Sequence, residues 1–197
     1  MARLKEYNGH YCESEYEYAF IGFLEAEGWK YSSGNNISRV TKRDVLIADD
    51  FKKFIADTNP DLTEDEVIQI YDNVRLVGAE SDFATLHKVY GWMVNGVQFT
   101  TQDGLPRMIP LIDFDNWDKN IFRVVNQFTV EYTNNGQKEN RRPDVLLFVN
   151  GMPLCVIELK NPADANATIY DAWEQINIRY WRDIPHLLHY CPLACIS

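Results

Sequence analysis

The fold of this chain is decided by residues 141–160, which read Arg-Arg-Pro-Asp-Val-Leu-Leu-Phe-Val-Asn-Gly-Met-Pro-Leu-Cys-Val-Ile-Glu-Leu-Lys. Two apolar runs flank an Asn-Gly pair, which is the strongest short-range signal for a β-hairpin. Asp144 stands at the start of the first predicted strand, whereas Glu158 and Lys160 lie at the end of the second. Charged groups in an apolar strand are costly unless they have partners. The charges at this end of the hairpin therefore need an explanation.

The register of the hairpin decides whether the two carboxylates can meet. Neighbouring residues of a strand point to opposite faces, so Glu158 and Ile157 lie on different sides of the sheet. A regular two-residue turn would pair Asp144 with Ile157 and place it on the face opposite Glu158. A shared site therefore requires an irregularity such as a β-bulge. Pro153 favours one, because proline cannot donate a hydrogen bond to the ladder.

The totals of the sequence set the class of protein. Its 197 residues, 46% of them apolar, suffice for a large domain with its own core. The formal net charge of −10 argues against a protein that coats nucleic acid through general electrostatics, although it permits a local basic strip. The chain has no apolar run of roughly 18 residues and no signal peptide, so we expect no membrane association. Its four cysteines lack zinc-ligand spacing, and we expect reduced thiols in a cytoplasmic protein.

Along the chain, helical patterns come first and strand patterns follow. Apolar residues at helical spacing, with capping residues before them, predict helices at 14–28, 44–58, 63–74, 81–94 and 168–182. Alternating patterns predict strands at 97–100, 108–114, 122–132, 187–190 and 193–196, besides the two of the hairpin. A polar loop is expected at 133–140. This order favours an α/β fold with a central mixed sheet flanked by helices.

The spacing of the charged residues matches a known nuclease motif. Pro143-Asp144, followed fourteen residues later by Glu158-Leu159-Lys160 on an apolar strand, fits the PD-(D/E)XK pattern. Its surroundings resemble the N-terminal domain of type I restriction enzyme R subunits. The resemblance is carried by residues 17–21 with Gly28-Trp29, 111–116, Asn126-Gln127 and 142–162. It covers most of the chain and is specific over 111–190.

The resemblance implies a fold and a function. The fold would be a restriction-endonuclease-like core in a single domain over 1–197, with additional helices at about 44–94, at the start of a longer chain. The function would be Mg²⁺-dependent cleavage of double-stranded DNA after ATP-driven translocation by a motor outside this sequence. ATP is not expected to bind here, since no Walker motif occurs. The implied partners are the methyltransferase (M) and specificity (S) subunits of a bacterial or archaeal complex in the cytoplasm.

The catalytic chemistry follows from the residue types. Asp144 and Glu158 would hold one or two Mg²⁺ ions, because this hard cation prefers carboxylate oxygens. The main-chain carbonyl of Leu159 would add a third ligand. Lys160 would orient the attacking water or stabilise developing negative charge. The alternative is structural: Asp144 as a loop residue, and Glu158 with Lys160 as an exposed ion pair worth under about 1 kcal/mol.

Four further residues are candidates for a supporting role. The family carries a Gln-x3-Tyr motif on the helix after the strands, but here Gln175 precedes Tyr180 by five residues rather than four. Either the helix accommodates the shift or Gln175 is out of place. Glu17 could supply a carboxylate from the first helix, yet a capping box with Ser14 explains it equally well. Gln127 matches a family position, and structural hydrogen bonding explains it as well as function does.

A basic cluster beside the motif could contact DNA. Its members are Lys138, Arg141 and Arg142, with Arg179 on the following helix. They could bind the phosphate backbone or form an ordinary solvated surface. Two rival functions also remain: a stand-alone repair or resolvase nuclease of the same fold, and a catalytically silent interaction module.

Overall fold

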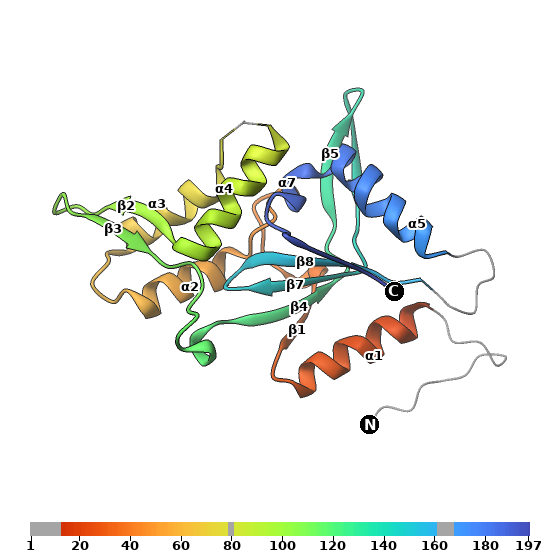
Figure 1. Ribbon diagram of the computed structural model, residues 1–197, viewed down its shortest axis with the longest axis horizontal. Helices are drawn as coiled ribbons and strands as arrows, with labels where there is room; N and C mark the ends of the chain where they lie inside the picture. The colour runs from red at the N-terminus through yellow and green to blue at the C-terminus, as the bar shows by residue number, and fades with distance from the viewer. Residues whose placement is uncertain (1–12, 79–80, 161–167) are drawn as a thin grey trace.

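A computed structural model describes residues 13–78, 81–160 and 168–197 of the chain (Figure 1). At its centre lies a five-stranded sheet in the order β1-β4-β7-β8-β9. These strands are β1 (Lys30–Ser33), β4 (Phe122–Asn126), β7 (Val145–Val149), β8 (Met152–Glu158) and β9 (Leu193–Ile196). The outer pairs β1–β4 and β8–β9 are parallel, whereas β4–β7 and β7–β8 are antiparallel. The sheet is therefore mixed, as the sequence predicts.

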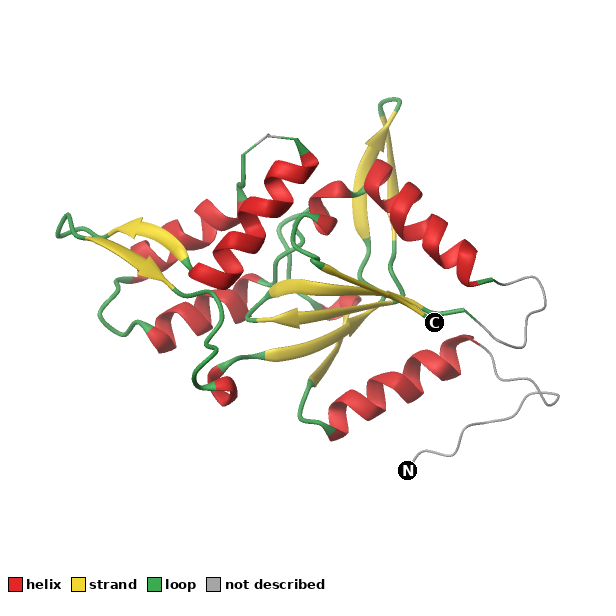
Figure 2. Ribbon diagram, viewed as in Figure 1, coloured by secondary structure: helices red, strands yellow, loops and turns green. Residues whose placement is uncertain are grey.

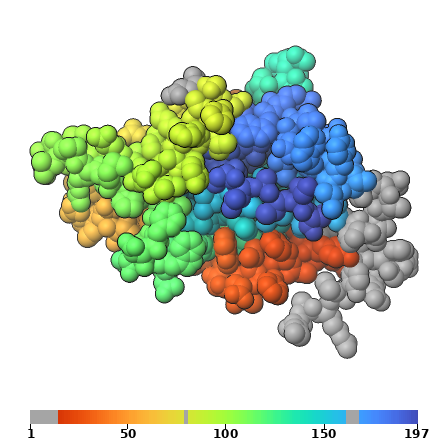
Figure 3. Space-filling view, viewed as in Figure 1, coloured from red at the N-terminus to blue at the C-terminus, as the bar shows by residue number. Residues whose placement is uncertain are grey.

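Helices cover both faces of this sheet (Figure 2). On one face lies α1 (Glu13–Ala26), whose Ile21 packs against Val124 of β4 and Ile157 of β8. The other face is covered by the C-terminal helical segment, which buries Ile176 and Tyr180. This segment comprises α5 (Ile169–Glu174), a π-helix (Gln175–Tyr180), α6 (Trp181–Asp183) and α7 (Pro185–Leu188). On the face seen in the space-filling view, α1 and the last residues of the chain cover most of the sheet, and part of β7 and β8 is visible between them (Figure 3).

The remaining elements are three helices, which share the larger hydrophobic core with the sheet, and two further hairpins. Helices α2 (Ala48–Thr58), α3 (Glu64–Arg75) and α4 (Asp82–Asn95) lie together with the hairpin of β2 (Val97–Thr100) and β3 (Pro106–Ile109). A second hairpin, β5 (Val130–Asn134) and β6 (Gln137–Arg141), stands beside α5. Two short 3₁₀-helices occur at Gly34–Asn36 and Trp117–Lys119.

Most predicted helix starts are confirmed, and one is wrong. Thr63 and Glu66 form the expected capping box at α3, and Ser81 caps α4 through the backbone N–H of Ala84. Asp44 does not cap α2, which begins only at Ala48. The backbone N–H of Ile47 instead donates to Gly151 of the β7–β8 turn (2.8 Å), and this contact holds the segment before α2 extended. The Ser14 side chain of the predicted first capping box lies outside the described residues.

Three predicted strands and one predicted loop also differ from the structure. The expected strand 122–132 breaks at Gln127, whose φ of 55° lies in the left-handed region and ends β4. The expected loop 133–140 is instead the turn and arms of the β5–β6 hairpin. Residues 187–190 are not a strand, because Pro185 occupies the first turn of α7 and starts a helix there. β3 also ends at Ile109, short of the predicted 114.

The β7–β8 hairpin contains the predicted irregularity. Val149 pairs with Met152 and Phe148 with Pro153, but Leu147 pairs with Cys155. Leu154 is therefore an extra residue on β8, which makes a β-bulge. Beyond the bulge Val145 pairs with Ile157, and the next step of this register places Asp144 opposite Glu158. The bulge thus brings the two carboxylates to the same face of the sheet.

The turn of this hairpin is held by a buried asparagine. Asn150 is fully buried, and its side-chain amide donates to the carbonyl of Leu111 (2.9 Å) and to Asn120 Oδ1 (2.8 Å). Its Oδ1 accepts from the backbone N–H of Ile121 (2.7 Å). These bonds attach the turn to segment 111–121.

We expect Asn150→Ala to lower the free energy of unfolding by about 3 kcal/mol or more, because it leaves buried partners without hydrogen bonds and strains a positive φ. Asn135→Ala is the matched control. Asn135 begins the exposed Asn-Gly turn of the β5–β6 hairpin, with φ 47° against 50° at Asn150. It should cost only about 1 kcal/mol. Urea unfolding measures both, and equal losses would contradict the role given to the buried amide.

Candidate active site

The centre of the candidate site is a buried carboxylate at the end of β8. Glu158 is fully buried, and Tyr180 Oη donates to its Oε1 at 2.6 Å. Gln175 Nε2 donates to its Oε2 at the same distance. Burial, and then the nearby charge of Asp144, raise the pKa of Glu158 to about 8, against the opposing effects of Tyr180 and Lys160. A carboxylate whose pKa is raised by burial and by a second carboxylate is a candidate for a functional site.

Asp144 lies beside Glu158 at the start of β7. Its Oδ2 accepts a hydrogen bond from the backbone N–H of Leu159 (2.8 Å), which fixes the carboxylate against the end of β8. Asp144 is only partly buried, whereas Glu158 is inaccessible to solvent. One carboxylate thus faces the surface and the other forms the floor of the site.

Lys160 completes the predicted trio on the same face. Its Nζ donates to Gln175 Oε1 at 3.4 Å, and the same amide donates to Glu158. Ile157 and Leu159 point to the opposite face, where they pack with Ile21 of α1. The alternation predicted from the sequence is therefore confirmed, and Glu158 and Lys160 are not an exposed pair on an edge strand.

The one-residue shift between Gln175 and Tyr180 is accommodated by a π-helix. Residues Gln175–Tyr180 are wound as a π-helix, in which backbone hydrogen bonds join residues five apart instead of four. Gln175 Nε2 therefore reaches Tyr180 Oη (2.8 Å), and both groups reach Glu158. Burial and the charge of Glu158 raise the pKa of Tyr180, so this hydroxyl is a stable donor. Gln175 is not out of place.

Glu17 lies on the other face of the sheet. Its Oε1 accepts from the amide of Asn126 (2.6 Å), whose own Oδ1 accepts from Tyr31 Oη (3.0 Å). Asn126 shares the face of Val124, which packs against α1, and not that of Glu158. The structure therefore places Glu17 in a buried network under β4, on the α1 side of the sheet. Sequence reasoning assigned no role to Asn126 or Tyr31, and only their residue types hinted at a network.

The four basic candidates have different surroundings. Arg141 is bound to Asp183, with Nη2 2.6 Å from Oδ2, and the two arginines Arg182 and Arg141 lower the pKa of Asp183 to about 2. Arg142 Nη1 donates to Gln127 Oε1 (2.5 Å). Arg179 is half exposed, 3.7 Å from Glu174, and Lys138 is exposed on β6. Arg141, Arg142 and Arg179 line one hollow, whereas Lys138 lies outside it.

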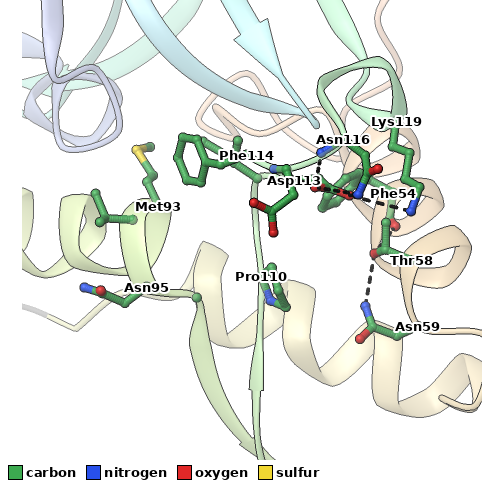
Figure 4. A pocket seen from close by; sticks show the side chains of 14 residues that line it. Phe54, Thr58, Asn59, Met93, Asn95, Pro110, Asp113, Phe114, Asn116 and Lys119 are labelled. Carbon is green, nitrogen blue, oxygen red and sulfur yellow. Dashed lines mark hydrogen bonds and ion pairs between the residues drawn. The ribbon is translucent and has the colours of Figure 1, made fainter.

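Metal-ligating side chains (Asp, Glu, His or Cys) gather in groups of fewer than three throughout the described residues 13–78, 81–160 and 168–197, the candidate site included. A larger hollow, of about 420 Å³, lies between α2, α4 and residues 110–119 (Figure 4). Its Asp113 is occupied by the backbone N–H groups of Asp115 (3.1 Å) and Asn116 (2.7 Å), and Lys119 is 3.8 Å away. That carboxylate therefore stabilises its own loop.

Comparisons with known proteins agree with the geometry. A family model described as type I restriction enzyme R protein N terminus matches residues 11–197. The chain belongs to this family. It is 35% identical over 191 residues to a Methanocaldococcus jannaschii protein provisionally named the type I restriction enzyme MjaIXP endonuclease subunit, and 92% of the chain is covered. It is 30% identical over 199 residues to the type I restriction enzyme HindI endonuclease subunit of Haemophilus influenzae, with 94% covered.

The match covers a small part of each relative. The chain spans 18% of the length of the M. jannaschii protein and 18% of that of the H. influenzae protein. In the part of the chain that the structure describes, no helix is both long and apolar enough to cross a bilayer.

The raised pKa of Glu158 predicts how the stability of the metal-free protein depends on pH. The folded protein holds this proton more tightly than the unfolded chain, in which the pKa is about 4.5. The resulting contribution is full below pH 4.5 and is lost as the pH rises through 8. We expect Glu158→Gln to be more stable than the parent at pH 9, by an amount on the order of a few kcal/mol, and similar to it at pH 5.

Chemical unfolding at the two pH values measures this difference. Glu139→Gln is the control, because the hydrogen bond from Tyr132 lowers the pKa of that exposed carboxylate. It should not stabilise the protein at pH 9. Parallel pH profiles for the parent and Glu158→Gln would contradict the assigned titration.

Proposed function

We propose that this chain is the Mg²⁺-dependent DNA endonuclease domain of a type I restriction enzyme R subunit. The observation that carries the proposal is the meeting of Asp144, Glu158 and Lys160 at one end of the β7–β8 hairpin. Family membership supports it, since the relatives are named as endonuclease subunits. The reaction would be hydrolysis of a phosphodiester bond in double-stranded DNA.

The donor set fits magnesium. Mg²⁺ is commonly held by one or two carboxylates and fills its remaining positions with water and substrate phosphate. Asp144 and Glu158 supply such a pair, and the main-chain carbonyl of Leu159 is the third candidate ligand. The hydrogen bonds to Glu158 come from Tyr180 and Gln175, and each carboxylate oxygen keeps a second lone pair. When bound, the cation supplies charge neutralisation and a water of lowered pKa.

The remaining groups act on the water and on the charge. Lys160 donates a hydrogen bond to the attacking water or to the phosphoryl oxygens, where negative charge develops. Gln175 bridges Lys160 and Glu158, so it fixes the distance between the ammonium and the carboxylate. Tyr180 holds the other oxygen of Glu158. Gln175 and Tyr180 are therefore positioning residues.

The larger assembly is part of the proposal. Relatives more than five times as long leave room for a motor, and ATP-driven translocation would belong to that part of such a chain. The methyltransferase and specificity subunits would select the DNA, in the cytoplasm of a bacterium or an archaeon. This division of labour fits the acidic net charge of −10, because the domain need not find DNA unaided.

We expect Asp144→Ala and Lys160→Ala to abolish DNA cleavage by the reconstituted complex in Mg²⁺ while ATP hydrolysis continues. Plasmid cleavage and phosphate release measure the two activities. Asp49→Ala, at an exposed carboxylate on α2, should cut normally. Loss of both activities would show that Asp144 or Lys160 is structural.

The rival functions give other results in the same assay. Efficient cutting by residues 1–197 alone, without partners or ATP, would favour a stand-alone nuclease. A reconstituted complex that never cuts would favour a silent interaction module.

Removal of the groups that hold Glu158 should reduce turnover without abolishing it. Tyr180→Phe removes one hydrogen bond to a charged group, worth roughly 1.5–3 kcal/mol, so we expect kcat to fall about 10- to 100-fold. Gln175→Ala should cost at least as much, because it also releases Lys160. KM for DNA should change little, since both groups act through Glu158. A rise in KM at constant kcat would instead assign them to DNA binding.

A further inference from the structure

We propose that a basic hollow beside the candidate active site binds a DNA backbone phosphate adjacent to the scissile one, and that Gln127 positions Arg142 for this contact. The inference rests on the proposed nuclease function and adds to it a subsite for the DNA strand. It also separates the four basic candidates, since the hollow uses some of them and not others.

The hollow lies directly against the catalytic groups. It has a volume of about 200 Å³ and is lined by Asn140, Arg141, Arg142, Gln175, Arg179 and Tyr180. One wall is the end of β6 and the residue that follows it, and the other is the π-helix. Gln175 and Tyr180 belong to this wall and also donate to Glu158 at 2.6 Å. Gln175 and Tyr180 thus connect the hollow with Glu158.

The three arginines of the hollow differ in whether a neighbouring carboxylate already neutralises their positive charge. Arg141 is committed to Asp183, which is 8% exposed, so it acts mainly as a fixed wall. Arg179 has a loose partner in Glu174 at 3.7 Å. Arg142 makes no ion pair with any carboxylate in the described part of the chain, and its bond to Gln127 leaves the cation unneutralised. Arg142 is exposed, so its guanidinium is accessible to an anion, which it can bind with two parallel hydrogen bonds.

Gln127 is held in a strained conformation while it makes this bond. Its φ of 55° is unfavourable for a residue with a side chain, and such strain costs of the order of 1–3 kcal/mol. The conformation breaks the strand between β4 and β5 and turns the amide towards Arg142, 2.5 Å away. The backbone there is tightly packed, because a Cβ at Gly34 would lie 2.8 Å from the Gln127 carbonyl carbon. The fold therefore maintains the strain.

The occupant that fits is a phosphodiester of the bound strand. A guanidinium matches two phosphate oxygens with parallel hydrogen bonds. The shared wall of Gln175 and Tyr180 places this group next to the position where the scissile phosphate meets Asp144 and Glu158. Contacts with neighbouring phosphates fix the register of a duplex without reading its sequence. This suits a domain whose target is chosen by other subunits.

The test measures DNA binding at several KCl concentrations. Fluorescence anisotropy with a labelled duplex in EDTA records affinity without cleavage. Arg142→Ala should weaken binding about tenfold and reduce the slope of log K against log[KCl] by about one. Arg142→Lys should keep the slope but regain only part of the affinity, because lysine lacks the planar fork. Arg179→Ala should weaken binding about threefold.

A double-variant cycle tests the role of Gln127. Gln127→Gly suits the positive φ and removes the acceptor, so it should weaken binding about threefold without loss of fold. The pair Gln127→Gly with Arg142→Ala should bind no more weakly than Arg142→Ala alone. Additive losses would show that Gln127 does not act through Arg142. Arg107→Ala is the matched control. Arg107 lies on β3 and forms an exposed ion pair with Asp61, and the variant should bind DNA as the parent does.

The outcomes separate this inference from the proposed function. Suppose that the parent binds DNA, that Asp144→Ala abolishes cleavage and that Arg142→Ala keeps the full salt slope. The phosphate subsite in the hollow would then be contradicted, whereas the proposed nuclease function would be supported. A parent that neither binds nor cuts DNA overturns both. A free phosphate ion is the other anion that could occupy the hollow, and calorimetry with inorganic phosphate measures its binding. Tight phosphate binding that depends on Arg142, with unchanged DNA affinity, would identify a free-anion site and overturn the DNA assignment.

Discussion

The extra residue at Leu154 is the constraint on which the site depends. Side chains of a strand alternate between faces, so one inserted residue exchanges the faces of everything beyond it. With the bulge, Asp144 and Glu158 share a face, and without it Asp144 would oppose Ile157. The same shift keeps Ile157 and Leu159 in the core under α1. One irregularity thus satisfies both the core and the site.

The surroundings of the Glu158 carboxylate barely stabilise its negative charge. Glu158 is fully buried next to a second carboxylate, and its pKa of about 8 reflects that cost. Tyr180 and Gln175 offset the cost only in part. The arrangement of buried Glu158 beside partly buried Asp144 therefore costs stability. A divalent cation bound as proposed would relieve the repulsion between the two carboxylates.

The sequence predicts the bulge of the β7–β8 hairpin, but it misses irregularities elsewhere in the chain. Asp144, Glu158 and Lys160 are candidates because an apolar strand makes each charge conspicuous, and Pro153 indicates the bulge that brings the two carboxylates to one face. The break at Gln127 is missed because alternation continues through 122–132 and carries no sign of a positive φ. The burial of Asn150 is equally invisible, since its partners come from residues about thirty to forty positions away. Local patterns do not report such distant contacts.

The strand and the helix that form the site each contain one inserted residue. Leu154 adds a residue to β8, and the π-helix adds one between Gln175 and Tyr180. Each insertion breaks a regular period, yet each brings side chains to the same carboxylate. The bulge places Asp144 beside Glu158. The π-helix lets both Gln175 and Tyr180 donate to Glu158. Irregular backbone persists where surrounding contacts over-determine it. Both irregularities therefore converge on Glu158, and this geometry supports the proposed active site independently of the motif.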